Sequence, residues 1–172
     1  MRLKLPICYF DAKTKILCPL CRDKLERGEI SELDVDVSHD LVKLEEHEFP
    51  QLKEAEFVKA LKADNVTLIL VKSKSKVTRT VWNRVARQLS KKGYGRVKIV
   101  EYTNDVKNLI QNIIFPARVL SMSIVWFPDG TSEHYVRVSP RDLRRIPLSP
   151  KAVESVVEEL IGVKVRITSE KF

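Results

Sequence analysis

Three cysteines near the start of the chain have the spacing of metal ligands. Cys18 and Cys21 are separated by two residues, and this knuckle spacing lets two thiolates hold one zinc ion. Cys8 precedes them, and Asp11 stands where a second knuckle would have its other cysteine. A carboxylate oxygen also binds zinc, although less typically in a structural site. We therefore predict a zinc ion held by Cys8, Asp11, Cys18 and Cys21.

Two alternatives to this ligand set stay open at the level of sequence. In the first, His39 or His47 is the fourth ligand in place of Asp11. In the second, the metal has been lost and flanking apolar side chains form a small plug. The residues of such a plug are Ile7, Phe10, Ile16, Leu17 and Leu20. Residues 1–28 are too few to bury a core that orders them alone, which favours a metal staple. No HExxH or HxE…CxxC pattern occurs, so the predicted zinc is structural rather than catalytic.

The second chemical feature is a basic segment in the middle of the chain. Residues 72–98 contain ten Lys and Arg side chains and no acidic one, whereas residues 29–64 contain eleven acidic and four basic residues. The net charge is +8 and the pI is about 9.4. Such segregation indicates a polyanionic partner, with a solvated charged surface as the alternative. The candidate nucleic-acid contacts in this segment are Lys72, Lys74, Lys76, Arg79, Arg84, Lys91 and Lys92.

Hydrophobic periodicity predicts the elements that carry these residues in the first half. We expect an extended lead-in over 33–37, then a helix over roughly Ser38–Glu48 with Ser38 as its N-cap. A hairpin is predicted over Glu54–Ala63 and Val66–Val71, with a turn at Asp64 and Asn65. The basic segment then contains a helix with an apolar stripe that includes Trp82, followed by a strand over Arg96–Tyr102.

The second half repeats this order of elements. A helix capped by Thr103 or Asn104 joins the halves. Strands are predicted at Arg118–Phe127, Glu133–Val138 and Val163–Thr168, with Ser139 and Ser149 each capping a helix between the last two. The order strand, turn, strand, loop, helix, strand therefore occurs twice. Basic residues again lie near the loop, and the candidate contacts there are Arg141, Arg144, Arg145 and Lys151.

The chain resembles tandem KH units of the archaeal NusA type. The resemblance is carried by Val97–Tyr102, Asp105, Pro116–Val119 and Ile161–Ile167, within roughly residues 30–170. It implies an α+β fold of two type II KH units, each a three-stranded sheet with packed helices. It also implies RNA binding in transcription elongation or termination, with nascent RNA or RNA polymerase as partners.

Taken together, these features predict four segments. They are a zinc-knuckle or zinc-ribbon unit (residues 1–28), a first KH-like unit (29–102), a linking helix (103–115) and a second KH-like unit (116–172).

The KH resemblance has one departure that bears on function. KH units hold RNA through a GXXG loop whose glycines allow close approach of the backbone to phosphates. The corresponding stretches here, Lys72–Lys76 and Leu148–Lys151, contain no glycine. Lysine charge in the first loop would retain affinity but weaken base register. Tyr94, between two glycines, is expected to be exposed and available to stack on a base, or else to pack on the sheet.

We therefore expect a non-catalytic RNA-binding protein, because no Gly-rich phosphate loop or catalytic constellation is present. A ribosome- or ribosomal-RNA-associated factor is one alternative, and a protein-interaction scaffold with degenerate KH units is another. The N-terminal residues lack a signal-peptide core and no apolar run is long enough to cross a membrane. The expected setting is accordingly cytoplasmic, without a membrane or a small-molecule substrate as partner.

Overall fold

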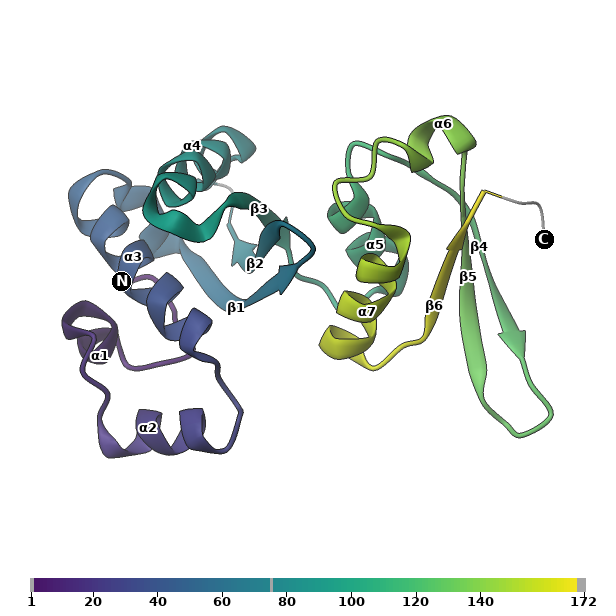
Figure 1. Ribbon diagram of the computed structural model, residues 1–172. Helices are drawn as coiled ribbons and strands as arrows, with labels where there is room; N and C mark the ends of the chain where they lie inside the picture. Colours follow the sequence, from purple (N-terminus) through teal and green to yellow (C-terminus); the bar gives the residue numbers. More distant parts are fainter. Residues whose placement is uncertain (1, 75, 170–172) are drawn as a thin grey trace. The chain divides into compact units, whose positions relative to one another are not determined.

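The computed structural model describes residues 2–74 and 76–169, and the chain divides into two compact units, Met1–Tyr102 and Thr103–Phe172 (Figure 1). Each unit contains one three-stranded sheet with helices packed against it. This confirms the predicted α+β class with two such sheets. The segment 1–28 lies within the first unit, and the segment 103–115 lies within the second. Among the described residues, no helix combines the length and apolar character that crossing a bilayer requires.

The sheet of the first unit has the order β1-β2-β3, formed by β1 (Ala55–Ala63), β2 (Val66–Ser73) and β3 (Arg96–Glu101). The first two strands pair antiparallel through the predicted turn, where Asp64 has a φ of 53°. The last two pair in parallel, which requires a crossover connection, and α4 (Arg79–Leu89) supplies it. The hairpin and the crossover helix are as predicted.

Helix α3 (Glu32–His47) corrects the prediction of an extended stretch before a later helix. It begins six residues earlier than expected, at a capping box made by Ser31 and Asp34, while Ser38 is buried inside it. The helix buries two faces at once. Val37, Leu41 and Leu44 pack in the cluster against the sheet, whereas Val35 and Val42 pack in the cluster of the cysteine segment. Burial on two sides places apolar residues two apart, which imitates the period of a strand.

Asp34 joins this helix to the sheet. Its Oδ2 accepts the Ser31 N–H at 3.0 Å, and its Oδ1 accepts the Ala60 N–H at 2.8 Å. Ala60 lies just beyond the register shift between Phe57 and Lys59 of β1, where the strand bulges. The carboxylate is buried, so both donors would be left without a protein partner if it were removed.

Replacing Asp34 with alanine is expected to lower the free energy of unfolding by about 2–3 kcal/mol, because it removes a helix cap and leaves a buried N–H unpaired. Urea unfolding followed by circular dichroism measures the loss. Asp36→Ala is the matched control, since Asp36 pairs with Lys15 on an exposed surface and should contribute less than about 1 kcal/mol. Equal effects of the two changes would contradict the assigned role of Asp34.

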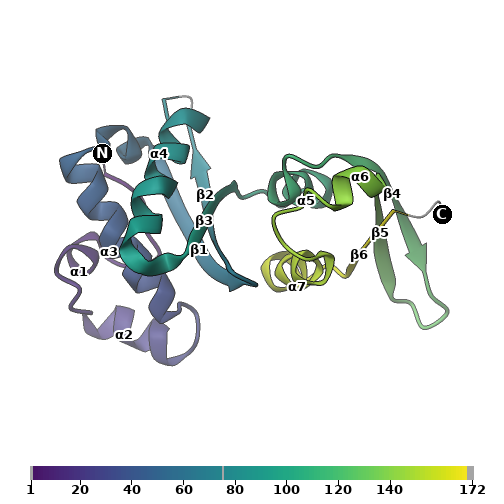
Figure 2. The same cartoon turned by 45° about the horizontal axis from the view of Figure 1, so that its top comes forward.

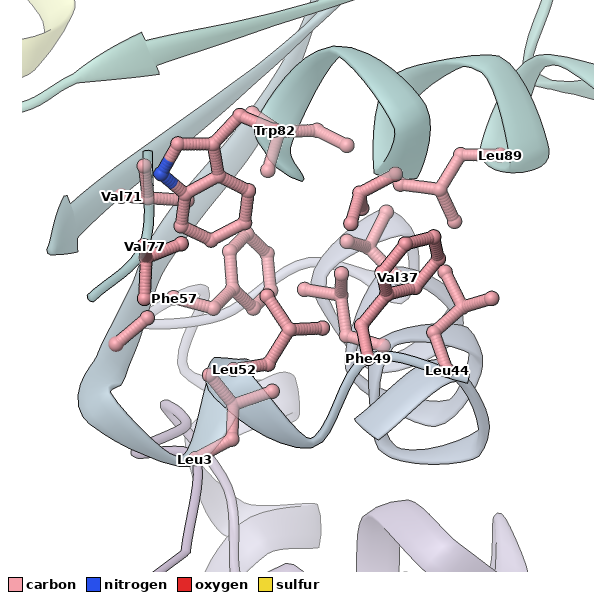
Figure 3. Packing of buried hydrophobic residues seen from close by; sticks show 14 of the residues in the cluster. Leu3, Val37, Leu44, Phe49, Leu52, Phe57, Val71, Val77, Trp82 and Leu89 are labelled. Atoms are coloured by element: carbon pink, nitrogen blue, oxygen red, sulfur yellow. The ribbon is translucent and has the colours of Figure 1, made fainter. Parts of the chain in front are cut away.

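The core of the first unit lies between α3, α4 and the sheet (Figure 3). Trp82 of α4 is buried with Phe57 of β1 and Leu52 of η1 (Pro50–Glu54), as its place on the apolar stripe predicted. The chain leaves α4 through η2 (Ser90–Tyr94), where Gly93 has a φ of 93° and ends the helix. The basic side chains of α4 are therefore confined to the face that does not enter the core.

The second unit repeats this pairing, with strands β4 (Val119–Trp126), β5 (Ser132–Val138) and β6 (Val165–Thr168) in that order. The first pair is antiparallel and the second is parallel. The helices are α5 (Val106–Ile114), α6 (Pro140–Leu143) and α7 (Pro150–Ile161), and Figure 2 shows α5 and α7 on the same side of the sheet. The predicted duplication is confirmed.

The cap of α5 differs from the prediction. Asp105, rather than Thr103 or Asn104, is the N-cap, and its Oδ2 accepts the Asn108 N–H at 3.1 Å. The Thr103 hydroxyl instead accepts the Asp105 N–H. Three capping residue types in succession leave the helix start undetermined within two positions, and local backbone geometry selects the last of them.

Candidate metal centre and basic surfaces

The four predicted metal ligands converge in the first unit. Cys8 precedes α1 (Tyr9–Thr14), Asp11 lies in its first turn, Cys18 precedes α2 (Pro19–Glu26) and Cys21 lies in its first turn. Their ligand atoms all lie within 4.8 Å of one another. The Sγ atoms of Cys8 and Cys21 are 3.7 Å apart. Two sulfurs each 2.3 Å from a tetrahedral zinc would be separated by about 3.8 Å, so this spacing suits a common metal ion.

Backbone donors surround the ligand atoms. The Cys18 N–H donates to Asp11 Oδ2 at 2.9 Å, and the Cys8 N–H donates to Cys21 Sγ at 3.4 Å. Cys21 and Asp11 are buried, at 1% and 4% exposure, whereas Cys8 is exposed. Burial raises the pKa of the Cys21 thiol to about 12. Burial also acts to raise the pKa of Asp11, but hydrogen bonds from Cys18 outweigh it and hold that pKa below its usual value.

The alternatives for the fourth ligand are resolved by position. Nδ1 of His39 lies 2.7 Å from the Ala12 carbonyl oxygen, and within the described residues the donor set around the three thiols contains Asp11 and neither His39 nor His47. Asp11 is therefore the fourth group that the fold brings to the cysteines.

The predicted apolar plug forms only in part, because three of its five residues are exposed. Phe10, Ile16 and Leu20 are 72%, 71% and 75% exposed, so they do not fill a core. The other two, Ile7 and Leu17, pack in or against the buried cluster beside the cysteines, which also contains Ile30, Val35 and Val42. The segment thus buries few of its own large apolar residues, which favours stabilisation by the ligand cluster and by docking to α3.

Glu45 of α3 holds the N-terminal segment in place. Its Oε1 accepts from the Tyr9 hydroxyl at 2.9 Å, and its Oε2 accepts from the Leu3 N–H at 2.7 Å. Burial and the bond to Glu45 together raise the pKa of Tyr9 far above its ordinary value. Lys4 then pairs with Glu56 in a parallel bridge, which extends the sheet beyond β1.

The predicted basic residues of the first unit are exposed. Lys72, Lys74 and Lys76 lie on the stretch that leaves β2, and Arg79 is the first residue of α4. The Ser73 N–H and hydroxyl both donate to the Glu101 carboxylate at 2.8 Å, which anchors the start of this loop. The lysines of this loop therefore project from a fixed point at the end of the central strand.

Two of the remaining candidates in this unit, Arg84 and Lys92, have partners within the chain. The guanidinium carbon of Arg84 lies 5.2 Å from the centroid of the Phe49 ring, and Lys92 Nζ lies 3.4 Å from Asp40 Oδ1. Lys91 is exposed on η2. The pair of Lys92 is solvent-accessible and therefore weak, so it can exchange for a phosphate at little cost.

Tyr94 is not the exposed stacking residue that its sequence context suggested. It is partly buried against the core, and its hydroxyl donates to Asp40. Burial and the Asp40 carboxylate raise the pKa of Tyr94 well above its ordinary range. The flanking Gly93 and Gly95 both have positive φ, so they turn the backbone and direct the ring inward. The alternative prediction of packing on the sheet is the correct one.

In the second unit, the predicted residues gather around the connection between α6 and α7. Arg141 lies in α6, Arg144 and Arg145 follow it, and Lys151 is the second residue of α7. All four are exposed, and Arg145 lies 3.5 Å from Asp142 Oδ1. This connection joins the hairpin to the crossover helix, as the lysine loop does in the first unit.

Lys98 of β3 has an unusual environment for a lysine. Burial, with a smaller contribution from the positive charge of Arg79, lowers the pKa of Lys98 to about 8. An unfolded chain keeps the proton of a lysine until about pH 10.4. Between pH 8 and 9 the unfolded state therefore binds the proton that the folded state has released, and stability rises with pH.

We expect the free energy of unfolding to rise by an amount on the order of 0.5 kcal/mol between pH 8 and 9, a value reduced for partial solvent screening. Urea unfolding at the two pH values measures this rise. Lys98→Met should abolish it, whereas Lys62→Met, at an exposed position on β1, should leave it unchanged. A rise that survives in Lys98→Met would show that another group is responsible.

A cationic cavity was missed in the sequence. It has a volume of about 190 Å³, and the cations that line it are Arg2, Lys4, Lys53, Lys72 and Lys74. Lys72 and Lys74 were predicted contacts, but the other three come from the N-terminal segment and η1. The sequence around Arg2, Lys4 and Lys53 contains no basic run. The pairing of Lys4 with Glu56 in the structure is what shows that these residues share one wall.

Comparison with known proteins adds no family. No protein-family model matches the chain, and no curated protein matches it. Among solved structures, the crystal structure of APE1850 is 19% identical in sequence, covers 65% of this chain and 86% of that chain, and has a TM-score of 0.47.

Proposed function

We propose that this chain is a non-catalytic RNA-binding protein whose N-terminal segment holds a structural zinc ion. The observation that carries the proposal is the placement of exposed cations on the same connection in both units. Lys72, Lys74 and Lys76 lead from β2 to α4, and Arg144 and Arg145 lead from α6 to α7. Cations that project from loops anchored on a sheet attract a phosphate backbone.

RNA is the favoured polyanion because of the resemblance to KH units, which bind single-stranded RNA at this connection. Without glycines the backbone of either loop approaches phosphates less closely, so side-chain charge supplies the affinity. The expected binding is strongly salt-dependent and tolerant of sequence. Specific reading of bases is not expected to depend on these loops.

The zinc assignment is supported by the donor set. Three thiolates and one carboxylate form a closed four-ligand set, which suits a structural zinc ion better than a hard cation that prefers oxygen. Bound zinc would supply a crosslink between α1 and α2. Cys8, Cys18, Cys21 and Asp11 would hold it, and the N–H groups of Cys8 and Cys18 would orient two of those ligands.

A role in transcription elongation or termination, with RNA polymerase as protein partner, follows from the NusA resemblance. Phe10, Ile16 and Leu20 are exposed on the segment that carries the metal ligands, and they offer apolar side chains for a protein contact there. The ribosome is the second candidate partner for the same surfaces. Co-purification with RNA polymerase, compared with co-sedimentation with ribosomal subunits, distinguishes the two.

Fluorescence anisotropy of labelled single-stranded RNA with the full zinc-loaded chain tests the proposal. We expect saturable binding at low salt that weakens steeply as salt is raised. Single-stranded DNA of the same sequence and double-stranded RNA serve as comparison ligands. If none of the three nucleic acids binds at low salt, the chain is a protein-interaction scaffold and the proposed function is wrong.

A further inference from the structure

The cationic cavity of the first unit gathers exposed cations from three segments of the chain. The N-terminal segment supplies Arg2 and Lys4, η1 supplies Lys53, β2 supplies Lys72, and Lys74 follows the end of that strand. Two carboxylates, Glu54 and Glu56, also line it. Five cations against two anions leave an excess of three positive charges around one small space.

The size and lining of the cavity indicate the class of ligand. Sites for drug-sized organic molecules usually have volumes of about 300–1,000 Å³. This cavity encloses about 190 Å³, and Ala55 is the apolar residue in its lining. Lys72 Nζ lies 4.0 Å from Glu56 Oε2, a long and exposed contact that a stronger anion can replace. A single phosphate group fits both the charge and the size.

The walls of the cavity are held in place before any ligand binds. The Arg2 guanidinium lies 4.5 Å from the centroid of the Tyr9 ring, and Tyr9 is fixed by Glu45. The Lys4 N–H donates to the Ala55 carbonyl oxygen at 3.1 Å, and the Phe57 N–H donates to the Lys4 carbonyl oxygen at 2.8 Å. The ring contact orients the Arg2 guanidinium, and the backbone bonds fix the position of Lys4 in the wall, so the wall loses less conformational freedom on binding than an unanchored segment would.

We propose that this cavity binds a terminal phosphate of RNA, an inference that rests on the RNA-binding function proposed above. An internal phosphodiester carries one charge and must continue in two directions, whereas a terminal monoester carries between one and a half and two charges at neutral pH. The excess of cations and the small volume both suit the terminal group. The exposed lysines beyond the cavity would then contact the phosphates that follow.

The test compares one short RNA with a 5′-phosphate, a 3′-phosphate or hydroxyls at both ends, by anisotropy with the full zinc-loaded chain. We expect one phosphorylated form to bind about tenfold tighter than the hydroxyl form, the effect of one added charge-assisted contact. Inorganic phosphate should abolish this preference by competition. Equal affinity of all three RNAs would overturn the inference and leave the RNA-binding proposal intact.

Variants at the cavity separate it from the lysine loop. The double variant Lys53→Gln/Arg2→Gln should abolish the preference for the phosphorylated RNA. It should still bind the hydroxyl form, because neither residue belongs to the predicted loop contacts. Lys107→Gln removes the same charge from the exposed surface of α5 and should preserve the preference. A preference that survives in the double variant would show that the phosphate binds elsewhere, and would overturn the assignment.

The failure of RNA binding as a whole would be distinguishable from the failure of the cavity. If no RNA binds, titration calorimetry with inorganic phosphate tests the cavity alone. Saturable phosphate binding that Lys53→Gln abolishes would support an anion site without RNA. Absence of phosphate binding in the native chain would overturn both inferences together.

Discussion

Replacing Cys21 with serine is expected to release the metal and unfold the N-terminal segment. The native chain should contain one zinc ion per molecule, and the variant should contain less than one tenth of that amount. Serine oxygen is a poor substitute for a thiolate as a zinc ligand, and burying a hydroxyl in place of the sulfur costs free energy. We expect the free energy of unfolding to fall by about 3–5 kcal/mol, since metal binding and local folding are coupled.

Elemental analysis after dialysis measures the metal, and thermal unfolding measures the stability. Asp11→Asn tests the carboxylate separately, and Asp23→Asn is its matched control with the same charge change on the exposed side of α2. The control should retain full zinc content. A native chain that is free of metal after zinc is supplied, and as stable with a chelator as without, would refute the zinc assignment.

The Lys72/Lys74/Lys76→Ala triple variant is expected to bind RNA at least tenfold more weakly at low salt. Each lysine that leaves a phosphate removes about 0.7 from the slope of log affinity against log salt for single strands, so the slope should become shallower by about 2. Binding curves at several salt concentrations give both quantities. The loss should be similar for different RNA sequences, because phosphate contacts carry no sequence information.

The matched control removes the same charge from positions outside the proposed RNA surface. Lys43, Lys62 and Lys107 are exposed on α3, β1 and α5, and their triple alanine variant should retain most of the affinity and the native salt slope. If both triple variants lose affinity equally, net charge rather than the loop determines binding. An unchanged slope in the Lys72/Lys74/Lys76 variant would place the RNA elsewhere.

Sequence periodicity was sufficient where an element buries one face. Alternation and a two-residue turn predicted the β1–β2 hairpin, and a single apolar stripe predicted α4 with Trp82 in the core. It failed for α3, whose Val35 and Val37 enter two different clusters. A helix buried on two sides loses the period of 3.6 in its hydrophobic pattern, so the strand-like alternation was misleading.

The candidate sites likewise have features that local spacing predicted and features that only the fold decided. The spacing of Cys18 and Cys21 predicted a shared ion because two residues of a tight turn set the distance between the thiols. The choice of Asp11 over His39 required the fold, since Ala12 occupies the Nδ1 of that histidine. The burial of Tyr94 was likewise decided by Asp40, fifty-four residues away in sequence.

By itself the sequence determined what is local: the knuckle spacing, the segregation of charge, the duplicated order of elements and the absence of glycine from both loops. The tertiary structure alone decided which distant residues meet, because contacts across the chain depend on packing that no short pattern records. The pairing of Lys4 with Glu56 is the clearest case, since it brings Arg2 to the place where the β1–β2 pairing already sets Lys53 near Lys72, and the three segments form one cavity.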